Sequence, residues 1–180
     1  GWFIEQLVSR GKTDVLAFLD DVEAMRVEPG RVGLVVLVSD GIPTVGLMDN
    51  FVLIERFSDR NPPGLSVFAF GAGPQLNRFL LDLLSYRNRG DSRLVPDRRR
   101  IGTELAALGA ELARPVLSEV RYALAGDAGR QVYPRVLMNL YQDRPLLLYG
   151  RVRADAPPSA VHIRGHSARG AMDLVFPLNW

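Results

Sequence analysis

The first 113 residues alternate between two hydrophobic patterns. Apolar residues recur at three- and four-residue steps, which predicts amphipathic helices near residues 3–8, 14–28, 48–58, 76–83 and 101–113. Continuous apolar runs at 32–38 and 65–70 predict strands buried on both faces, and 92–95 predicts a short third strand. This alternation is typical of a parallel sheet with helices on both faces, an α/β fold.

The pattern changes after Pro115. Short apolar segments separated by Gly, Asp and Pro predict strands at 116–124, 131–136, 144–152, 160–164 and 171–176. Such segments are typical of antiparallel β structure. We therefore predict part of a doubly wound parallel α/β domain in residues 1–114, followed by a β-sandwich-like segment in residues 115–180.

The first predicted strand raises a question of pairing. Its run Val35-Val36-Leu37-Val38 suits the middle of a sheet, because an exposed apolar edge offers unpaired backbone groups to other chains. Yet only helices are predicted upstream of it. We expect the missing neighbouring strands to lie before Gly1 or to come from a partner chain.

Composition narrows the function classes. The chain has 180 residues, 47% of them apolar, and a formal net charge of +2, which is too small to indicate nucleic-acid binding. The Arg98-Arg99-Arg100 cluster lacks interleaved aromatics and does not change this. Without cysteine there is no disulfide, thiolate nucleophile or cysteine-bound zinc. No apolar stretch approaches the roughly 20 residues of a membrane span.

The most distinctive polar residue is Asp40, in the Ser39-Asp40-Gly41 sequence that follows the first strand run. Open parallel sheets bind ligands beyond the carboxyl ends of their strands, and hard cations such as Mg²⁺ prefer oxygen ligands. Asp-Gly is also a common turn sequence, so Asp40 is either a turn residue or a cation ligand. Thr13 is likewise either a helix N-cap or a cation ligand.

Other candidate chemistry is weaker. Gly71 and Gly73 precede a predicted helix but lack the third glycine and the Lys-Ser/Thr ending of a phosphate loop, so a tight turn is favoured. His162 and His166 flank a glycine in β-like sequence and are predicted to be surface residues. Ser39 has no histidine partner for nucleophilic catalysis. The sequence does not predict an enzyme, and a nucleotide- or phosphate-binding doubly wound enzyme domain is the alternative.

Three ordered stretches resemble a known family. They are GKTD before a helix, VVLVSDGIPTVG, and SVFAFGAGPQLNRFLLDLLSYRNRG. Together they resemble the second half of a von Willebrand factor type A domain, in the variety found in inter-alpha-trypsin inhibitor heavy chains and their bacterial relatives. The downstream stretches ARPVLSEVRYAL and QVYPRVLMNLYQDRPLLLYGRV resemble the β segment that follows that domain, so the resemblance covers roughly residues 3–153.

The resemblance implies an adhesion module with a metal-ion-dependent adhesion site. Thr13 matches the threonine ligand of that site and Asp40 the aspartate after the fourth strand, whereas the Asp-x-Ser-x-Ser loop of the first strand would lie before Gly1. The expected ion is Mg²⁺, with Mn²⁺ or Ca²⁺ as substitutes, and the site is incomplete in this chain. The expected partners are a protein ligand with an acidic residue and the upstream half of the domain or a partner chain. A secreted or cell-envelope location is implied, and a structural scaffold with a decayed metal site is a further alternative.

Overall fold

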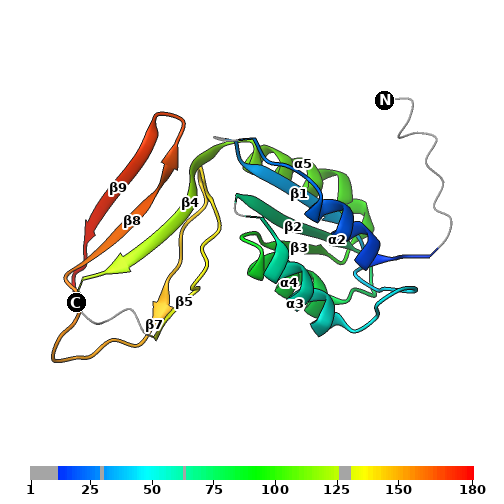
Figure 1. Ribbon diagram of the computed structural model, residues 1–180, viewed down its shortest axis with the longest axis horizontal. Helices are drawn as coiled ribbons and strands as arrows, with labels where there is room; N and C mark the ends of the chain where they lie inside the picture. The colour runs from blue at the N-terminus through cyan, green and yellow to red at the C-terminus, as the bar shows by residue number, and fades with distance from the viewer. Residues whose placement is uncertain (1–11, 29–30, 63, 126–130) are drawn as a thin grey trace.

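The structure is a computed structural model that describes residues 12–28, 31–62, 64–125 and 131–180. An α/β part and an antiparallel β part lie side by side along the long axis of the molecule (Figure 1). The helix predicted at residues 3–8 falls outside the described residues.

The α/β part contains a parallel sheet of three strands in the order β1-β2-β3. The strands are β1 (Gly33–Val38), β2 (Leu65–Ala72) and β3 (Ser92–Val95). The helices are α2 (Val15–Glu23), α3 (Asn50–Arg60), α4 (Arg78–Arg87) and α5 (Ile101–Leu112), the last preceded by the short 3₁₀ helix η1 (Arg98–Arg100). The sequence thus predicted the α/β fold and each of these four helices.

Two hydrophobic clusters cover the faces of this sheet. The larger one joins α2, α3 and α4 to one face, through residues such as Leu19, Phe57 and Leu81. The smaller one joins α5 to the other face, where Leu108 and Leu112 pack with Phe68 and Phe70. Figure 1 shows α5 on the side of the sheet opposite to α3 and α4.

The predicted burial was wrong for β1. Every residue of β2 except the last is buried, but β1 alternates, with Val35 and Leu37 buried and Leu34, Val36 and Val38 exposed. The exposed residues share the α5 face, and α5 lies over β2 and β3 without reaching β1. Among the described strands, β1 is also an edge strand, paired only with β2.

Two helices differ in part from the expected burial: Ile54 and Phe57 of α3 and Leu80 of α4 are buried as expected. Phe51 of α3 and Phe79 of α4 are about half exposed, and Leu81 and Leu84 contribute to the buried face of α4 instead. In addition, α2, the helix predicted at residues 14–28, ends at Glu23, several residues before Pro29. The spacing of apolar residues along a helix does not show which of two neighbouring apolar side chains faces the sheet.

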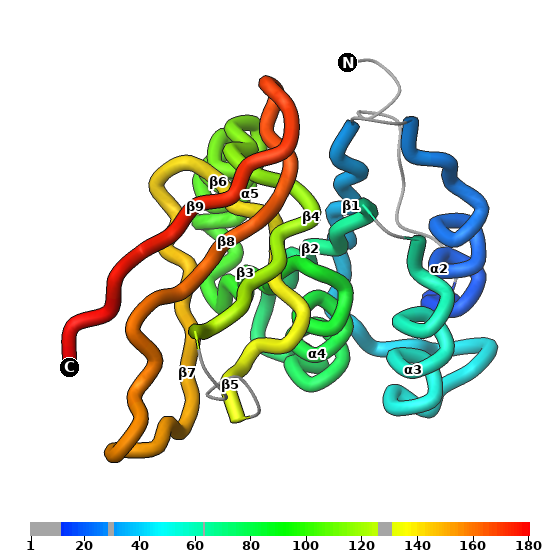
Figure 2. The backbone as a smooth tube through the Cα atoms, turned by 60° about the vertical axis from the view of Figure 1, so that its left-hand side comes forward, coloured from blue at the N-terminus to red at the C-terminus, as the bar shows by residue number. Residues whose placement is uncertain are grey.

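The antiparallel part has a four-stranded sheet in the order β6-β4-β8-β9, and Figure 2 shows β4, β8 and β9 running side by side. Its strands are β4 (Pro115–Leu124), β6 (Leu140–Tyr141), β8 (Ala160–Ser167) and β9 (Gly170–Pro177), and β5 (Val132–Tyr133) pairs separately with β7 (Tyr149–Gly150). The predicted strands 131–136 and 144–152 are therefore much shorter than expected. Pro134 directly follows β5 and ends it, because proline has no N–H to donate to a neighbouring strand.

The two parts are packed against each other near β6. The Tyr141 ring meets the Phe68 ring edge to face, with 5.9 Å between centroids, and Asn139 Nδ2 donates to Ser66 Oγ at 3.2 Å. Burial also raises the pKa of the Tyr141 hydroxyl. Since Tyr141 belongs to the α5-side hydrophobic cluster, the antiparallel part helps to cover the parallel sheet. The division into domains at residue 114 stays a prediction.

Candidate metal site at the carboxyl edge of the parallel sheet

Asp40 lies in a tight loop directly after β1. One carboxylate oxygen, Oδ1, accepts a hydrogen bond from the backbone N–H of Ile42 at 3.0 Å, as in the turn reading of this residue. The side chain is otherwise exposed. A carboxylate has several lone pairs, so a turn hydrogen bond leaves Asp40 able to bind a cation as well.

Gly41 fixes the shape of this loop. It has a φ of +74°, and a Cβ atom at this position would lie 2.8 Å from Cγ of Leu81. A side chain would therefore be strained by its backbone conformation and would clash with the buried face of α4. The loop is also tied to α4, since the Asn77 backbone N–H donates to the Asp40 carbonyl at 2.8 Å.

Thr13 is held beside the continuation of the same loop, at Thr44. The Thr13 backbone N–H donates to Thr44 Oγ1 at 2.7 Å, and the Thr44 N–H donates to the Thr13 carbonyl at 2.9 Å. These bonds join two segments that are 31 positions apart. The structure therefore brings the Thr13 segment and the loop that begins at Asp40 to one edge of the sheet.

The helix-capping reading of the sequence applies to Asp14 rather than to Thr13. The Asp14 carboxylate accepts from the Ala17 N–H at the start of α2, and Asp49 in the same way accepts from Phe51 and Val52 at the start of α3. Asp14 is also crowded by Gly46, where a Cβ atom would lie 2.7 Å from the Asp14 carboxylate. Both carboxylates cap helices, whereas the Asp40 carboxylate belongs to the loop directly after β1, at the carboxyl edge of the sheet.

The residues of this edge fit a divalent cation in part. One carboxylate and one hydroxyl are oxygen ligands of the kind that Mg²⁺ prefers. Across the described residues there is no group of three or more His, Asp or Glu side chains that could hold a metal ion. The assignment of Thr13 and Asp40 as metal ligands remains a prediction.

The glycine loop after β2 is poorly suited to hold a phosphate. The Gly73 N–H donates to the Val95 carbonyl at 3.0 Å, so it does not point to a ligand. The Asn77 side chain accepts from the Leu80 N–H and caps α4, whose N-terminus would otherwise attract an anion. Arg98 lies over Gly73, with Nε 3.5 Å from the position of an added Cβ.

The remaining sequence candidates lie far from this edge. His162 and His166 both lie on β8, with partly exposed side chains, near Asp173 and Glu119 respectively. They are surface residues of the antiparallel sheet, as expected. In the described part of the chain, no helix has the length and apolar character needed to cross a membrane.

Comparison with curated proteins places the chain near one group. It is 27% identical over 148 residues to human inter-alpha-trypsin inhibitor heavy chain H6, an alignment that covers 80% of this chain and 11% of the relative. It is 30% identical over 94 residues to heavy chain H2 of Mesocricetus auratus, covering 52% of this chain and 10% of the relative. The chain thus spans only about a tenth of the length of these relatives. No family model matches it.

Two solved structures share the fold. A von Willebrand factor type A protein from Catenulispora acidiphila aligns with a TM-score of 0.66 at 14% identity, over 97% of this chain and 48% of that one. The ArnB paralog VWA2 from Sulfolobus acidocaldarius aligns with a TM-score of 0.52 at 12% identity, over 96% of this chain and 48% of that one. The chain therefore has a von Willebrand factor type A-like fold and is similar in sequence to the inter-alpha-trypsin inhibitor heavy chains.

Proposed function

We propose that the chain is part of a non-enzymatic protein–protein interaction module. Its partner would contribute an acidic side chain to a divalent cation, Mg²⁺ or Mn²⁺, held at the carboxyl edge of the parallel sheet. Thr13 and Asp40 would be two of the protein ligands. An extracellular or envelope-associated location fits this role.

The observation that carries the proposal is a pair of hydrogen bonds between Thr13 and Thr44. The Thr13 N–H donates to the Thr44 hydroxyl, and the Thr44 N–H donates to the Thr13 carbonyl. They hold a threonine from the loop before α2 against the loop that begins at Asp40. A cation bound by one carboxylate and neutral oxygens keeps a positive charge, and an acidic side chain of a partner compensates that charge.

The remaining ligands would come from a further strand beside β1, supplied by another segment of the whole polypeptide or by a partner chain. Two features of β1 support this: its outer edge is unpaired among the described strands, and Leu34, Val36 and Val38 are exposed on one face. A strand and a covering helix on that side would bury this face and bring a third loop to the carboxyl edge.

The test is Mg²⁺ and Mn²⁺ binding by calorimetry, on this chain and on a longer polypeptide extended upstream by about one half of a domain. We expect binding by the longer polypeptide that is lost in Asp40→Ala, weakened in Thr13→Ala and retained in Thr13→Ser. Asp59→Asn, an exposed change on α3, is the control and leaves binding unaltered.

Two results would contradict the proposal. If neither polypeptide binds a divalent cation, the fold serves as a scaffold and Asp40 is only a turn residue. If a nucleotide binds instead, and this binding is lost on Arg98→Gln beside Gly73, the doubly wound enzyme domain is the better reading.

A further inference from the structure

A second candidate binding surface lies at the opposite end of the parallel sheet. A cavity of about 540 Å³ is lined by Gly64, Arg89, residues 119–124 of β4 and residues 135–137. Gly64 directly precedes β2, so the cavity is beside the amino end of that strand, whereas Asp40 follows the carboxyl end of β1. The two sites therefore have no residue in common.

The cavity follows an open strand edge. One edge of β4 pairs with β8 at Ser118 and from Arg121 to Leu124, with a bulge between them, and on the other edge β6 pairs only with Pro115 and Leu117. From Val120 to Leu124, the second edge faces the cavity without a neighbour among the described strands, whereas the Glu119 N–H is bonded to the Asn139 side chain. An open edge of this kind can pair with the backbone of an extended peptide.

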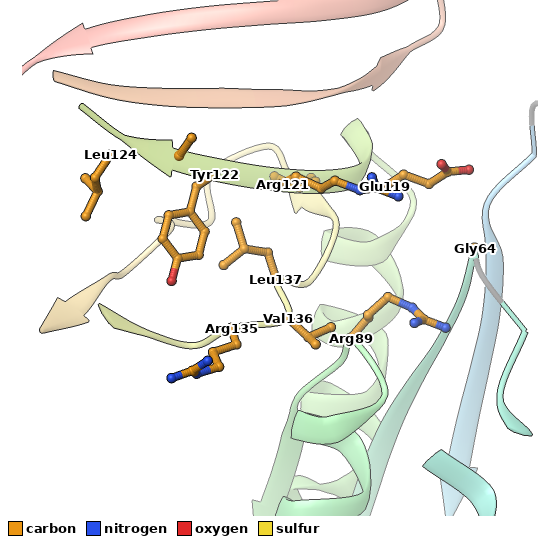
Figure 3. Close-up of a pocket in the computed structure, with 11 residues that line it drawn as sticks. Gly64, Arg89, Glu119, Arg121, Tyr122, Leu124, Arg135, Val136 and Leu137 are labelled. Carbon is orange, nitrogen blue, oxygen red and sulfur yellow. The ribbon is translucent and has the colours of Figure 1, made fainter. Parts of the chain in front are cut away.

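The charged lining is mainly basic. Arg89, Arg121 and Arg135 line the cavity together with a single carboxylate, that of Glu119. In the described part of the chain, no ion pair is formed by Arg89 or Arg121. In Figure 3, Arg89, Arg121 and Glu119 lie toward the Gly64 side of the cavity, and Arg135 lies toward the opposite side.

The Arg89 side chain is held in place by hydrogen bonds to the backbone carbonyls of other residues. Its guanidinium donates to the Pro62 carbonyl at 2.6 Å and to the Leu65 carbonyl at 3.0 Å and 3.2 Å. Burial lowers the pKa of this guanidinium, and the nearby charge of Glu119 raises it in part. Carbonyl oxygens orient a guanidinium without neutralising it, so a partly buried positive charge faces the cavity.

The backbone at two lining residues is strained. Arg89 and Glu119 have φ values of 60° and 51°, in the left-handed region that non-glycine residues rarely adopt. The Glu119 N–H is fixed in this bulge by the Asn139 side chain at 3.1 Å. Strained residues of this kind gather at ligand sites more often than elsewhere.

We propose that the cavity and the open edge of β4 together form a groove that binds an extended, acidic peptide segment of another protein. The backbone of this segment pairs with the open edge of β4, and its carboxylates lie beside Arg89 and Arg121. The half-exposed side chain of Val136 would contact an apolar part of the segment. This interaction needs no metal ion, so it is independent of the function proposed for Asp40.

The test uses two capped eight-residue peptides, one alternating threonine with glutamate and one alternating threonine with glutamine, each carrying a fluorophore. Fluorescence polarisation is measured with the 180-residue chain in EDTA, which removes divalent cations. We expect the glutamate peptide to bind about tenfold more tightly than the glutamine peptide, because its carboxylates meet the two arginines. Methylating alternate backbone nitrogens of the glutamate peptide removes its strand donors and weakens binding.

Single substitutions test which side chains cause the preference for the glutamate peptide. Arg121→Gln removes most of the preference for glutamate, Glu119→Gln strengthens binding of the glutamate peptide, and the exposed control Arg169→Gln changes neither. Arg121 is chosen over Arg89 because the Arg89 carbonyl contacts are also structural. Equal affinity of the two peptides, absence of binding by both, or a preference unaffected by Arg121→Gln would overturn the proposal.

Discussion

β1 and β2 are neighbouring parallel strands with similar apolar sequences, but they are buried to different extents. Val36 of β1 and Phe68 of β2 are paired in the sheet; Val36 is 41% exposed and Phe68 is fully buried. The difference comes from what covers each strand, since α5 and Tyr141 pack on Phe68, whereas Val36 belongs to none of the hydrophobic clusters of the described residues. An apolar strand sequence therefore does not by itself show which faces of the strand are covered.

The largest expected effect on stability concerns β2, the covered strand. Phe68→Ala removes a buried ring that packs against Tyr141 and α5, and we expect it to lower the free energy of unfolding by about 3–5 kcal/mol. The matched control Phe79→Ala, on the exposed side of α4, changes it by less than about 1 kcal/mol. Chemical denaturation measures both, and equal costs would show that Phe68 is not the covered residue.

A smaller effect is expected where the antiparallel part meets the α/β part. Arg144 forms ion pairs with Asp91, next to β3, and with Glu111 of α5, and its side chain is only 17% exposed. Arg144→Met leaves these carboxylates without that partner, and we expect a loss of about 1–3 kcal/mol that shrinks at high salt.

The control for this substitution is Arg31→Met, which disrupts an exposed pair with Glu28. It is expected to change stability by less than about 1 kcal/mol. Thermal denaturation at low and high salt compares the two variants. A cost for Arg144→Met no larger than that of the control would mean that these ion pairs do not stabilise the junction.

The smallest effect concerns the uncovered face of β1. Val36→Ala is expected to cost less than about 0.5 kcal/mol in this chain, since Val36 is already partly in water. Val67→Ala, the same change at a fully buried position of β2, is expected to cost about 1.6 kcal/mol from the two lost carbon groups alone. In the longer polypeptide the cost of Val36→Ala should rise toward that of Val67→Ala, and an unchanged cost would argue against a covering segment.

Much of the fold followed from the sequence, because long periodic segments specify their element type. The apolar runs of β1 and β2, the helices around Leu19 and Ile54, and the Asp-Gly turn after β1 are all local patterns. The strands at Val132 and Tyr149 are shorter than their apolar patterns predict, and in the first of them Pro134 ends the strand.

The candidate site was only partly visible in the sequence. The place of Asp40 after an apolar strand indicates it as a candidate, and the resemblance to a known family indicates Thr13. The bonds between Thr13 and Thr44 join residues 31 positions apart, and the groove beside Arg89 and Glu119 joins segments still further apart. Such arrangements depend on tertiary packing, which hydrophobic periodicity does not encode. Left-handed conformations at Arg89 and Glu119 were equally hidden, because glycine is the residue expected there.

The open edge of β1 can be examined directly by hydrogen exchange. The N–H groups of Gly33 and Ser39 donate to Gly64 and Phe70 beside them, and alternation along a strand therefore directs those of Leu34, Val36 and Val38 to the open edge. In this chain these three amides should exchange rapidly, whereas the amides of Val67 and Ala69, which are bonded to Asn88 and Asp91, should be protected.

The decisive measurement is the same exchange experiment on the longer polypeptide described above. If another strand completes the sheet and brings the remaining ligands to the carboxyl edge, the amides of Leu34, Val36 and Val38 become as protected as those of β2. If they exchange equally fast in both polypeptides, β1 is a true edge of the fold, and the proposed cation site beside Asp40 lacks the strand that it requires.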